Sequence, residues 1–224
     1  MTLDDLLRHP GLWRAGAVPL GSDGLSTGFP ALDELLPGGG WPRPGLIELL
    51  FDKPGIGVLR LLLPALASLS QRQQWLLWIA PPHRPYGPTL QAAGIDLQQV
   101  LVVELGSSAS TAPLPATSSA SLGWPLLGEN EFWAFEQALR FADCGAALAW
   151  ATELQSLALR RLQLACEAGG SLGFLFRPSA CASQPSPAAL RLLLARQASN
   201  GASLQIRILK ARGGGAAREC LVPL

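Results

Sequence analysis

The sequence predicts an α/β fold in which a doubly wound, mostly parallel sheet is flanked by helices. Short apolar runs alternate with helical segments along most of the 224 residues, as in parallel sheets whose strands are joined by crossover helices. A Pro/Gly-rich turn at 52–57 stands between an apolar run and a helical segment, which gives the order strand, loop, helix. A chain of this length suits one domain that buries roughly 70% of its unfolded surface.

The first half of the chain supplies three of the expected strands. A short helix is expected at 3–14 and a helical turn at 33–36, where Pro37 and three glycines stop it. Buried strands are expected in the apolar runs 46–50, 75–80 and 100–104. Helices are expected at 57–70 and 88–93, between these strands.

Residues 106–128 interrupt this alternation. Their Ser, Ala, Thr and Pro bias indicates an exposed, flexible insertion. A loop of this length inside a compact domain is either functional or disordered, and the composition favours disorder.

The second half completes the sheet and ends in a predicted β-hairpin. Helices are expected at 131–141 and 153–168, and strands at 146–150 and 171–176. The hairpin would pair 190–195 with 204–210 around an Asn-Gly turn at 200–201. We therefore divide the chain into an N-terminal helix and lead-in (1–20), a core (21–215) and a C-terminal tail (216–224).

Composition and charge indicate a protein that binds partners rather than one that holds a metal. Hydrophobic residues make up 49% of the chain and charged residues only 15%, which indicates an apolar surface with few charges. Such a surface is typical of a protein that works in a complex. The alternative is that Ala and Leu simply serve here as ordinary surface residues. Residues 1–139 carry 7 Lys/Arg against 12 Asp/Glu, whereas 140–224 carry 10 against 4, so the basic half could face an acidic partner or nucleic acid. The four cysteines lack metal-ligand spacing, and with no signal peptide at the start we expect reduced thiols and a cytoplasmic location.

The loop after the first strand has the form of a phosphate-binding loop without its functional side chains. Such a loop needs glycines, a Lys for the phosphates and a Ser or Thr for Mg²⁺, in the pattern G-x-x-x-x-G-K-[ST]. With Gly57 as the second glycine, the first falls on Asp52, the Lys on Val58 and the Ser/Thr on Leu59, and Gly55 is a further residue of this loop. The sequence therefore predicts a degenerate nucleotide loop, with no catalytic residue, no metal and no cofactor.

Further motifs lie on both sides of the loop. Upstream stand Leu25-Ser26-Thr27-Gly28, Leu32-Asp33 and Gly38-Gly39-Gly40 with Trp41-Pro42. This entry into the fold is similar to that of RecA-type recombinases. A longer set comprises Gly39-Gly40-Trp41-Pro42, Ala80-Pro81-Pro82 with Pro85-Tyr86, Leu159-Arg160-Arg161-Leu162, Phe176-Arg177-Pro178, Ser186-Pro187-Ala188-Ala189-Leu190-Arg191 and Leu209-Lys210-Ala211-Arg212. This set resembles the ImuA family, whose members are RecA-like, SulA-related proteins of bacterial damage-inducible mutagenesis cassettes. By the same resemblance the catalytic Glu of the recombinases falls on Pro82 and their Walker B Asp on Ala151.

The resemblance implies a non-enzymatic accessory protein of SOS-induced translesion DNA synthesis and mutagenesis. Its implied partners are an ImuB-type Y-family-like protein, a damage-induced replicative-type DNA polymerase and RecA, with DNA contacted weakly or indirectly. The alternative is a SulA-type cell division inhibitor that binds FtsZ, since SulA shares the degenerate RecA-like core. A third hypothesis, an ATPase with an unconventional loop, is disfavoured because both the Lys and the Walker B Asp are missing.

Seven side chains are candidates for partner binding. They are the basic residues and tryptophans that the patterns place in the basic half, in loops or on a helix: Arg160, Arg161, Arg177, Lys210, Arg212, Trp41 and Trp133. The arginines of 153–168 are expected on the solvent side of their helix, where they form either a solvated face or a partner face. Interface hot spots favour Trp, whereas Trp75, Trp78 and Trp150 lie in predicted strands and are expected to be core residues.

Overall fold

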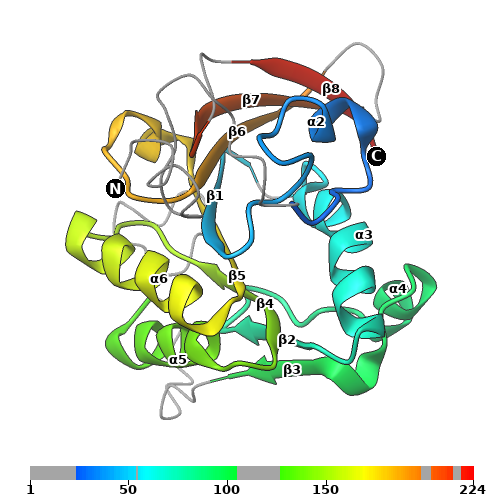
Figure 1. Ribbon diagram of the computed structural model, residues 1–224, viewed down its shortest axis with the longest axis vertical. Coiled ribbons are helices and arrows are strands. Elements are labelled where there is room, and N and C mark those ends of the chain that lie inside the picture. Colours follow the sequence, from blue (N-terminus) through cyan, green and yellow to red (C-terminus); the bar gives the residue numbers. More distant parts are fainter. Residues whose placement is uncertain (1–23, 54, 105–126, 198–202, 214–217) are drawn as a thin grey trace, which may run out of the picture.

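A computed structural model describes residues 24–53, 55–104, 127–197, 203–213 and 218–224. The helix expected at 3–14, residues 106–126 of the expected insertion and the Asn-Gly turn at 200–201 lie outside these residues. The described part is a mixed α/β fold, in which an eight-stranded sheet is flanked by helices (Figure 1). The strand order is β3-β2-β4-β5-β1-β6-β7-β8.

The strands of the sheet follow the expected alternation closely. Their bounds are β1 Gly45–Phe51, β2 Trp75–Ile79, β3 Val100–Val103, β4 Cys144–Trp150, β5 Leu172–Pro178, β6 Leu190–Arg196, β7 Ser203–Ala211 and β8 Glu219–Pro223. β1 to β6 pair in parallel, and the predicted hairpin is confirmed by the antiparallel pairing of β6 with β7. Every residue of β1 and β4 is buried, because helices cover both faces of a parallel sheet and leave no face for polar residues.

Helices cover the two faces of the sheet. Their bounds are α2 Pro30–Asp33, α3 Val58–Gln71, α4 Gly87–Ala92, α5 Glu129–Arg140 and α6 Ser156–Gly169, with short 3₁₀ helices η1 Leu97–Gln99 and η2 Ser179–Ser183. Figure 1 shows α5 and α6 on one side of the sheet and α3 on the other. Two buried apolar layers result, one under α3 and α2 and the other under α5 and α6.

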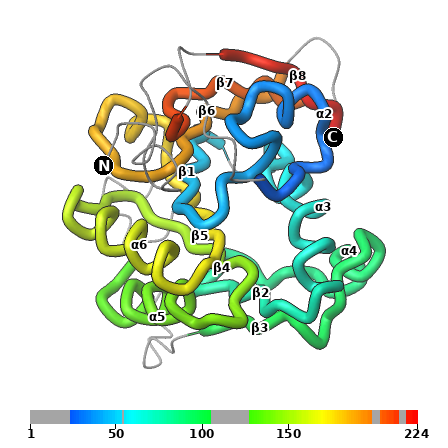
Figure 2. Tube along the Cα trace, in the orientation of Figure 1, coloured from blue at the N-terminus to red at the C-terminus, as the bar shows by residue number. Residues whose placement is uncertain are grey.

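The C-terminal end is part of the sheet and not a tail. We expected 216–224 outside the core, but Glu219–Pro223 form β8, which pairs antiparallel with β7 and buries Val222. The other end of the described chain meets it, since α2 lies beside β8 (Figure 2). A strand of five residues with one buried side chain carries too weak an apolar pattern to be predicted from the sequence.

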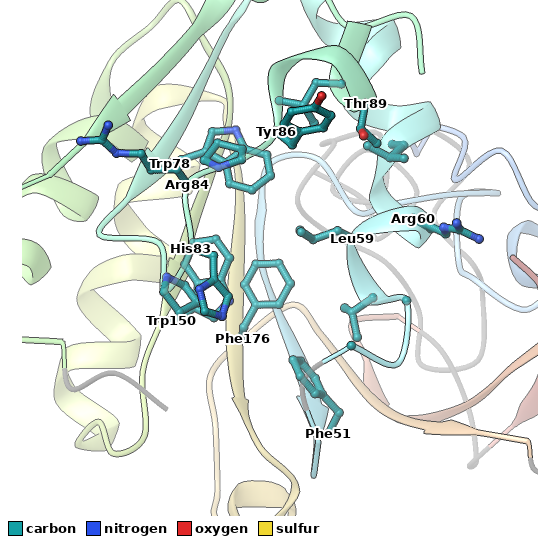
Figure 3. A pocket seen from close by; sticks show the side chains of 17 residues that line it. Phe51, Leu59, Arg60, Trp78, His83, Arg84, Tyr86, Thr89, Trp150 and Phe176 are labelled. Atoms are coloured by element: carbon teal, nitrogen blue, oxygen red, sulfur yellow. The ribbon is translucent and has the colours of Figure 1, made fainter. Parts of the chain in front are cut away.

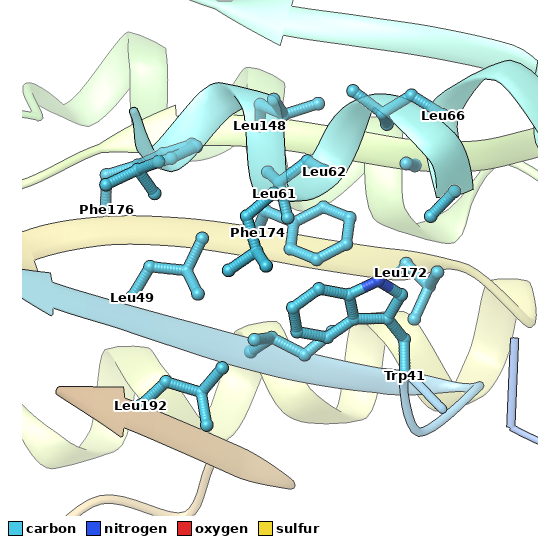
Figure 4. Close-up of a cluster of buried hydrophobic side chains, with 14 of the residues drawn as sticks. Trp41, Leu49, Leu61, Leu62, Leu66, Leu148, Leu172, Phe174, Phe176 and Leu192 are labelled. Carbon is cyan, nitrogen blue, oxygen red and sulfur yellow. The ribbon is translucent and has the colours of Figure 1, made fainter. Parts of the chain in front are cut away.

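Trp41 belongs to the core, so its prediction as a partner-binding residue is wrong. Its side chain has no exposed surface and packs edge-on against Phe174, with 5.4 Å between ring centroids and 86° between ring planes (Figure 4). Its backbone exchanges two hydrogen bonds with Leu25, which hold the Gly-rich entry segment against the sheet. A tryptophan in a loop therefore fills the core here, because the loop folds over the sheet.

Candidate functional site

The loop between β1 and α3 keeps the shape of a strand–loop–helix turn. Gly55 and Gly57 have φ of +81° and +96°, a region that L side chains rarely adopt, and Gly57 is the N-cap of α3. The side chains do not suit a phosphate group: Val58 is buried, and the carboxylate of Asp52 accepts a hydrogen bond from the Ser179 hydroxyl. An apolar side chain, Leu224, lies directly against Gly57.

A cavity of about 430 Å³ opens beside this loop, at the carboxyl ends of the central parallel strands. One wall comes from the strands and the segment that follows β2, and the other from the first turns of α3 (Figure 3). The side chains that define its shape are Leu59, Leu63, Trp78, Tyr86, Trp150 and Phe176. Open parallel sheets bind ligands at this edge, which makes the cavity the candidate functional site.

Aromatic rings from neighbouring strands stack along the strand side of the cavity. Trp150 and Phe176 are parallel within 6°, with centroids 4.7 Å apart, and Trp78 stacks on Trp150 at 6.1 Å and 28°. Phe51, the last residue of β1, meets Phe176 edge-on at 6.3 Å. The sequence interpretation of Trp78 and Trp150 as core residues is confirmed, but the cavity that they line was missed. The available signal was an aromatic at or next to the end of several apolar runs, since the ends of parallel strands meet at one edge.

The charged residues at the cavity face away from it. Figure 3 shows the Arg60 and Arg84 side chains pointing outward, on opposite sides of the opening. Arg84 forms a bidentate ion pair with Glu104, with both N–O distances at 2.7 Å. The lining also includes the polar side chains of His83, Tyr86 and Thr89, so the interior of the cavity is mainly apolar and aromatic.

A buried ion cluster lies under η2, on the opposite side of the sheet. Glu48 accepts hydrogen bonds from Arg177 at 2.8 Å and from Arg191 at 2.5 Å, and all three side chains are almost completely buried. Arg191 also donates to the carbonyl oxygen of Cys181 at 2.8 Å. The prediction of Arg177 as a partner-binding residue is therefore wrong, because its guanidinium is enclosed in the fold. Neither Glu48 nor Arg191 was a site candidate in the sequence, although Arg191 ends one of the motifs that resemble ImuA.

Arg160 and Arg161 lie on the exposed side of α6, as expected, but they differ in their contacts. Arg161 donates to Glu136 of α5 at 2.5 Å, and its guanidinium lies 4.9 Å from the ring centroid of Phe132. Burial alone would raise the pKa of Glu136, but hydrogen bonds from Arg161 and Arg140 outweigh it and hold that pKa below its usual value. Arg161 therefore joins α6 to α5, whereas no hydrogen bond or ion pair is found for Arg160 among the described residues.

The remaining candidates lie apart from one another. Lys210 Nζ donates to the carbonyl oxygen of Ser186 at 2.7 Å, and burial, reinforced by the charge of Arg191, lowers its pKa. Arg212 pairs with Glu167 near the end of α6 at 2.8 Å, and Trp133 of α5 is 63% exposed. The structure thus brings Arg212 towards α6 and places Lys210 near the buried ion cluster, while Trp41 lies under the other face of the sheet.

The part of the chain that the structure describes contains no group of three or more His, Cys, Asp or Glu residues able to hold a metal ion. Burial raises the pKa of the Cys144 thiol to about 12, so this cysteine is not a reactive thiolate. None of the described helices combines the length and the apolar character needed to cross a membrane.

Comparison with known proteins identifies the family. A family model described as "Cell division inhibitor SulA" matches residues 45–119. The cell division inhibitor SulA of Klebsiella aerogenes is 30% identical over 145 residues, which cover 63% of this chain and 73% of the relative. This chain belongs to the SulA family. SulA of Edwardsiella piscicida is 29% identical over 138 residues, 61% of this chain and 70% of that protein. The crystal structure of SulA from Pseudomonas aeruginosa aligns with a TM-score of 0.41 and 22% identity, over 59% of this chain and 97% of that one.

Family membership corrects the main functional interpretation of the sequence. A role as an accessory protein of translesion synthesis and mutagenesis was expected, but the matching family and the matching relatives are named cell division inhibitors. The motifs that carried the resemblance to ImuA are short, and most belong to the framework of the fold. They therefore could not separate two families that share this framework.

The loop between β1 and α3 of this SulA-family protein is expected not to bind Mg-ATP. No cation stands at the Lys position of the phosphate-binding pattern, because Val58 there is buried in the core and the next residue, Leu59, carries no charge. In addition, the Leu224 side chain lies against Gly57. Isothermal titration calorimetry with Mg-ATP should give only the heat of dilution. Saturable heat with micromolar affinity would contradict this expectation.

Proposed function

We propose that this protein is a non-enzymatic cell division inhibitor that acts in the cytoplasm as part of the SOS response, by binding FtsZ. The observation that carries the proposal is membership of the SulA family, through a relative named as a cell division inhibitor of which this chain covers 73%. The apolar side chains of the nucleotide loop support an action by binding alone. The partners implied by an accessory role in mutagenesis stay predictions from the resemblance to ImuA.

We further propose that the fold is a RecA-like core whose phosphate-binding loop has lost its functional side chains. In its support, β1 is central in a mostly parallel sheet, its loop has two glycines with positive φ, and α3 begins directly after Gly57. Pro82 lies at the rim of the cavity and Ala151 is buried after β4, where the RecA resemblance would place carboxylates. The separation of a lead-in at 1–20 from a core that starts at 21 belongs to the same proposal, with the core extended to include β8.

The surface that we assign to FtsZ is the outer stripe of α6. Leu157, Arg160 and Leu164 are spaced three and four residues apart and so share one face of the helix. The two leucines are 70% and 50% exposed, which is unusual for apolar side chains on a helix that packs on a sheet. A stripe of two exposed leucines around an arginine fits a partner surface that is apolar and acidic.

The test is FtsZ assembly followed by light scattering and by sedimentation in the presence of GTP. The wild-type protein should suppress assembly, and the double variant Leu157→Ser with Arg160→Glu should need at least about ten times the concentration, since truncated hot-spot side chains cost more than 1 kcal/mol each. Arg161 is left unchanged, because it also donates to Glu136 of α5, so its replacement would mix an effect on folding with an effect on binding.

The matched control makes the same chemical changes on the far edge of the sheet. Leu221→Ser with Arg218→Glu alters an exposed leucine and an exposed arginine at β8, and should inhibit assembly like the wild type. A wild-type protein with no effect on FtsZ assembly would overturn the proposed function. If the wild type inhibits and the α6 variant inhibits equally, the function stands and the assigned surface is wrong.

A further inference from the structure

We propose that the aromatic cavity at the carboxyl edge of the sheet is a binding site for a small, neutral, planar aromatic molecule of one or two fused rings. This ligand site is additional to the proposed inhibition of division and does not involve the α6 stripe. The class of ligand follows from the shape of the cavity, its stacked wall and the outward direction of its two arginines.

The shape of the cavity fits a small organic ligand. Its volume of about 430 Å³ falls within the range of roughly 300–1,000 Å³ that is usual for small-molecule sites. In Figure 3 the opening is bounded by Trp150 and Phe176 on the strand side and by Leu59 on the α3 side. A flat molecule between these walls would contact apolar atoms on both of its faces.

The wall itself selects for an aromatic ring. Trp78, Trp150 and Phe176 form a stack, in which the ring planes of Trp150 and Phe176 are nearly parallel, with an angle of 6° between them. Aromatic rings prefer offset stacked or edge-to-face neighbours, and a further ring gains about 0.5–1.5 kcal/mol beyond the burial of its area. The strand-end position of these side chains fixes their orientation, so the site is formed before the ligand arrives.

The direction of the two arginines disfavours ionic ligands. The lining includes Arg60 and Arg84, but both guanidinium groups point out of the opening, and Arg84 is held by Glu104. The α3 wall presents Val58, Leu59 and Leu63, so a charged ligand would lose its hydration without gaining a partner. A neutral ring loses little by the same transfer.

The probe that tests the site is indole, titrated into the full-length protein by isothermal titration calorimetry. We expect saturable binding with one indole per chain. Leu59→Glu should weaken this binding at least tenfold, because it places a carboxylate at the mouth of the cavity, where Leu59 is 39% exposed. The variant should fold normally, because an acidic residue in the first turn of a helix is favourable.

Two further variants separate loss of the site from other effects. Leu97→Glu introduces the same charge at a leucine that is 40% exposed and does not line the cavity, and it should bind indole like the wild type. Leu59→Trp fills the cavity without adding charge, and it should also weaken binding at least tenfold. Absence of saturable heat with the wild type, or wild-type affinity in Leu59→Trp while its circular dichroism melt is unchanged, would overturn the proposal.

Discussion

Replacing Glu48 with Gln is expected to lower the free energy of unfolding by about 3–5 kcal/mol, the usual cost of removing one partner from a buried ion pair. The substitution keeps the size of the side chain but leaves the guanidinium groups of Arg177 and Arg191 buried with no carboxylate between them. Folded domains are commonly stable by only 5–15 kcal/mol, so this loss would be a large share of the total. Urea denaturation at neutral pH measures the effect through the transition midpoint.

The control for this prediction is Glu104→Gln. Glu104 also forms an ion pair with an arginine, but this pair is exposed to solvent, and exposed pairs add little to stability. Its urea midpoint should match that of the wild type. Replacement of the whole cluster by apolar side chains (Glu48→Leu, Arg177→Met, Arg191→Leu) should recover much of the stability lost in Glu48→Gln. Equal midpoints for Glu48→Gln and Glu104→Gln would show that the buried cluster contributes no more than a surface pair.

Local patterns were sufficient for most elements of the fold, β8 excepted, and insufficient for contacts between them. The apolar run at 46–50, the glycines of the following loop and the hairpin of β6 and β7 each carry their signal within a few residues, and each lies where it was expected. The buried cluster could not be predicted in this way. Glu48 interrupts an apolar strand, and its register partner Arg191 is 143 residues away in the sequence.

The candidate site shows the same limit. Phe51, Trp78, Trp150 and Phe176 come from β1, β2, β4 and β5, and they meet only because these strands are parallel neighbours or near neighbours in the sheet. Their burial was predictable from the strand pattern, but their common edge required the strand order. The functional prediction failed for a related reason, since motifs that maintain a shared fold do not distinguish the families built on it.

Replacing Trp41 with Ala is expected to cost about 3–5 kcal/mol of stability, the usual range for truncating a large aromatic side chain in a core. Trp41 is fully buried between the sheet and α3, and its removal would leave a cavity beside Phe174 (Figure 4). Trp41→Phe should cost clearly less than Trp41→Ala, because phenylalanine keeps an aromatic ring in most of the space that alanine would leave empty. Neither variant loses a hydrogen bond, because the buried indole N–H has no acceptor among the described residues. The control is Trp133→Ala on α5, which removes the same side chain from an exposed position and should leave the melting temperature almost unchanged. Circular dichroism melts of the three variants measure the difference. If Trp41→Ala melted with the wild type while it lost FtsZ inhibition, Trp41 would be a partner-binding residue after all, and its place in the core would be refuted.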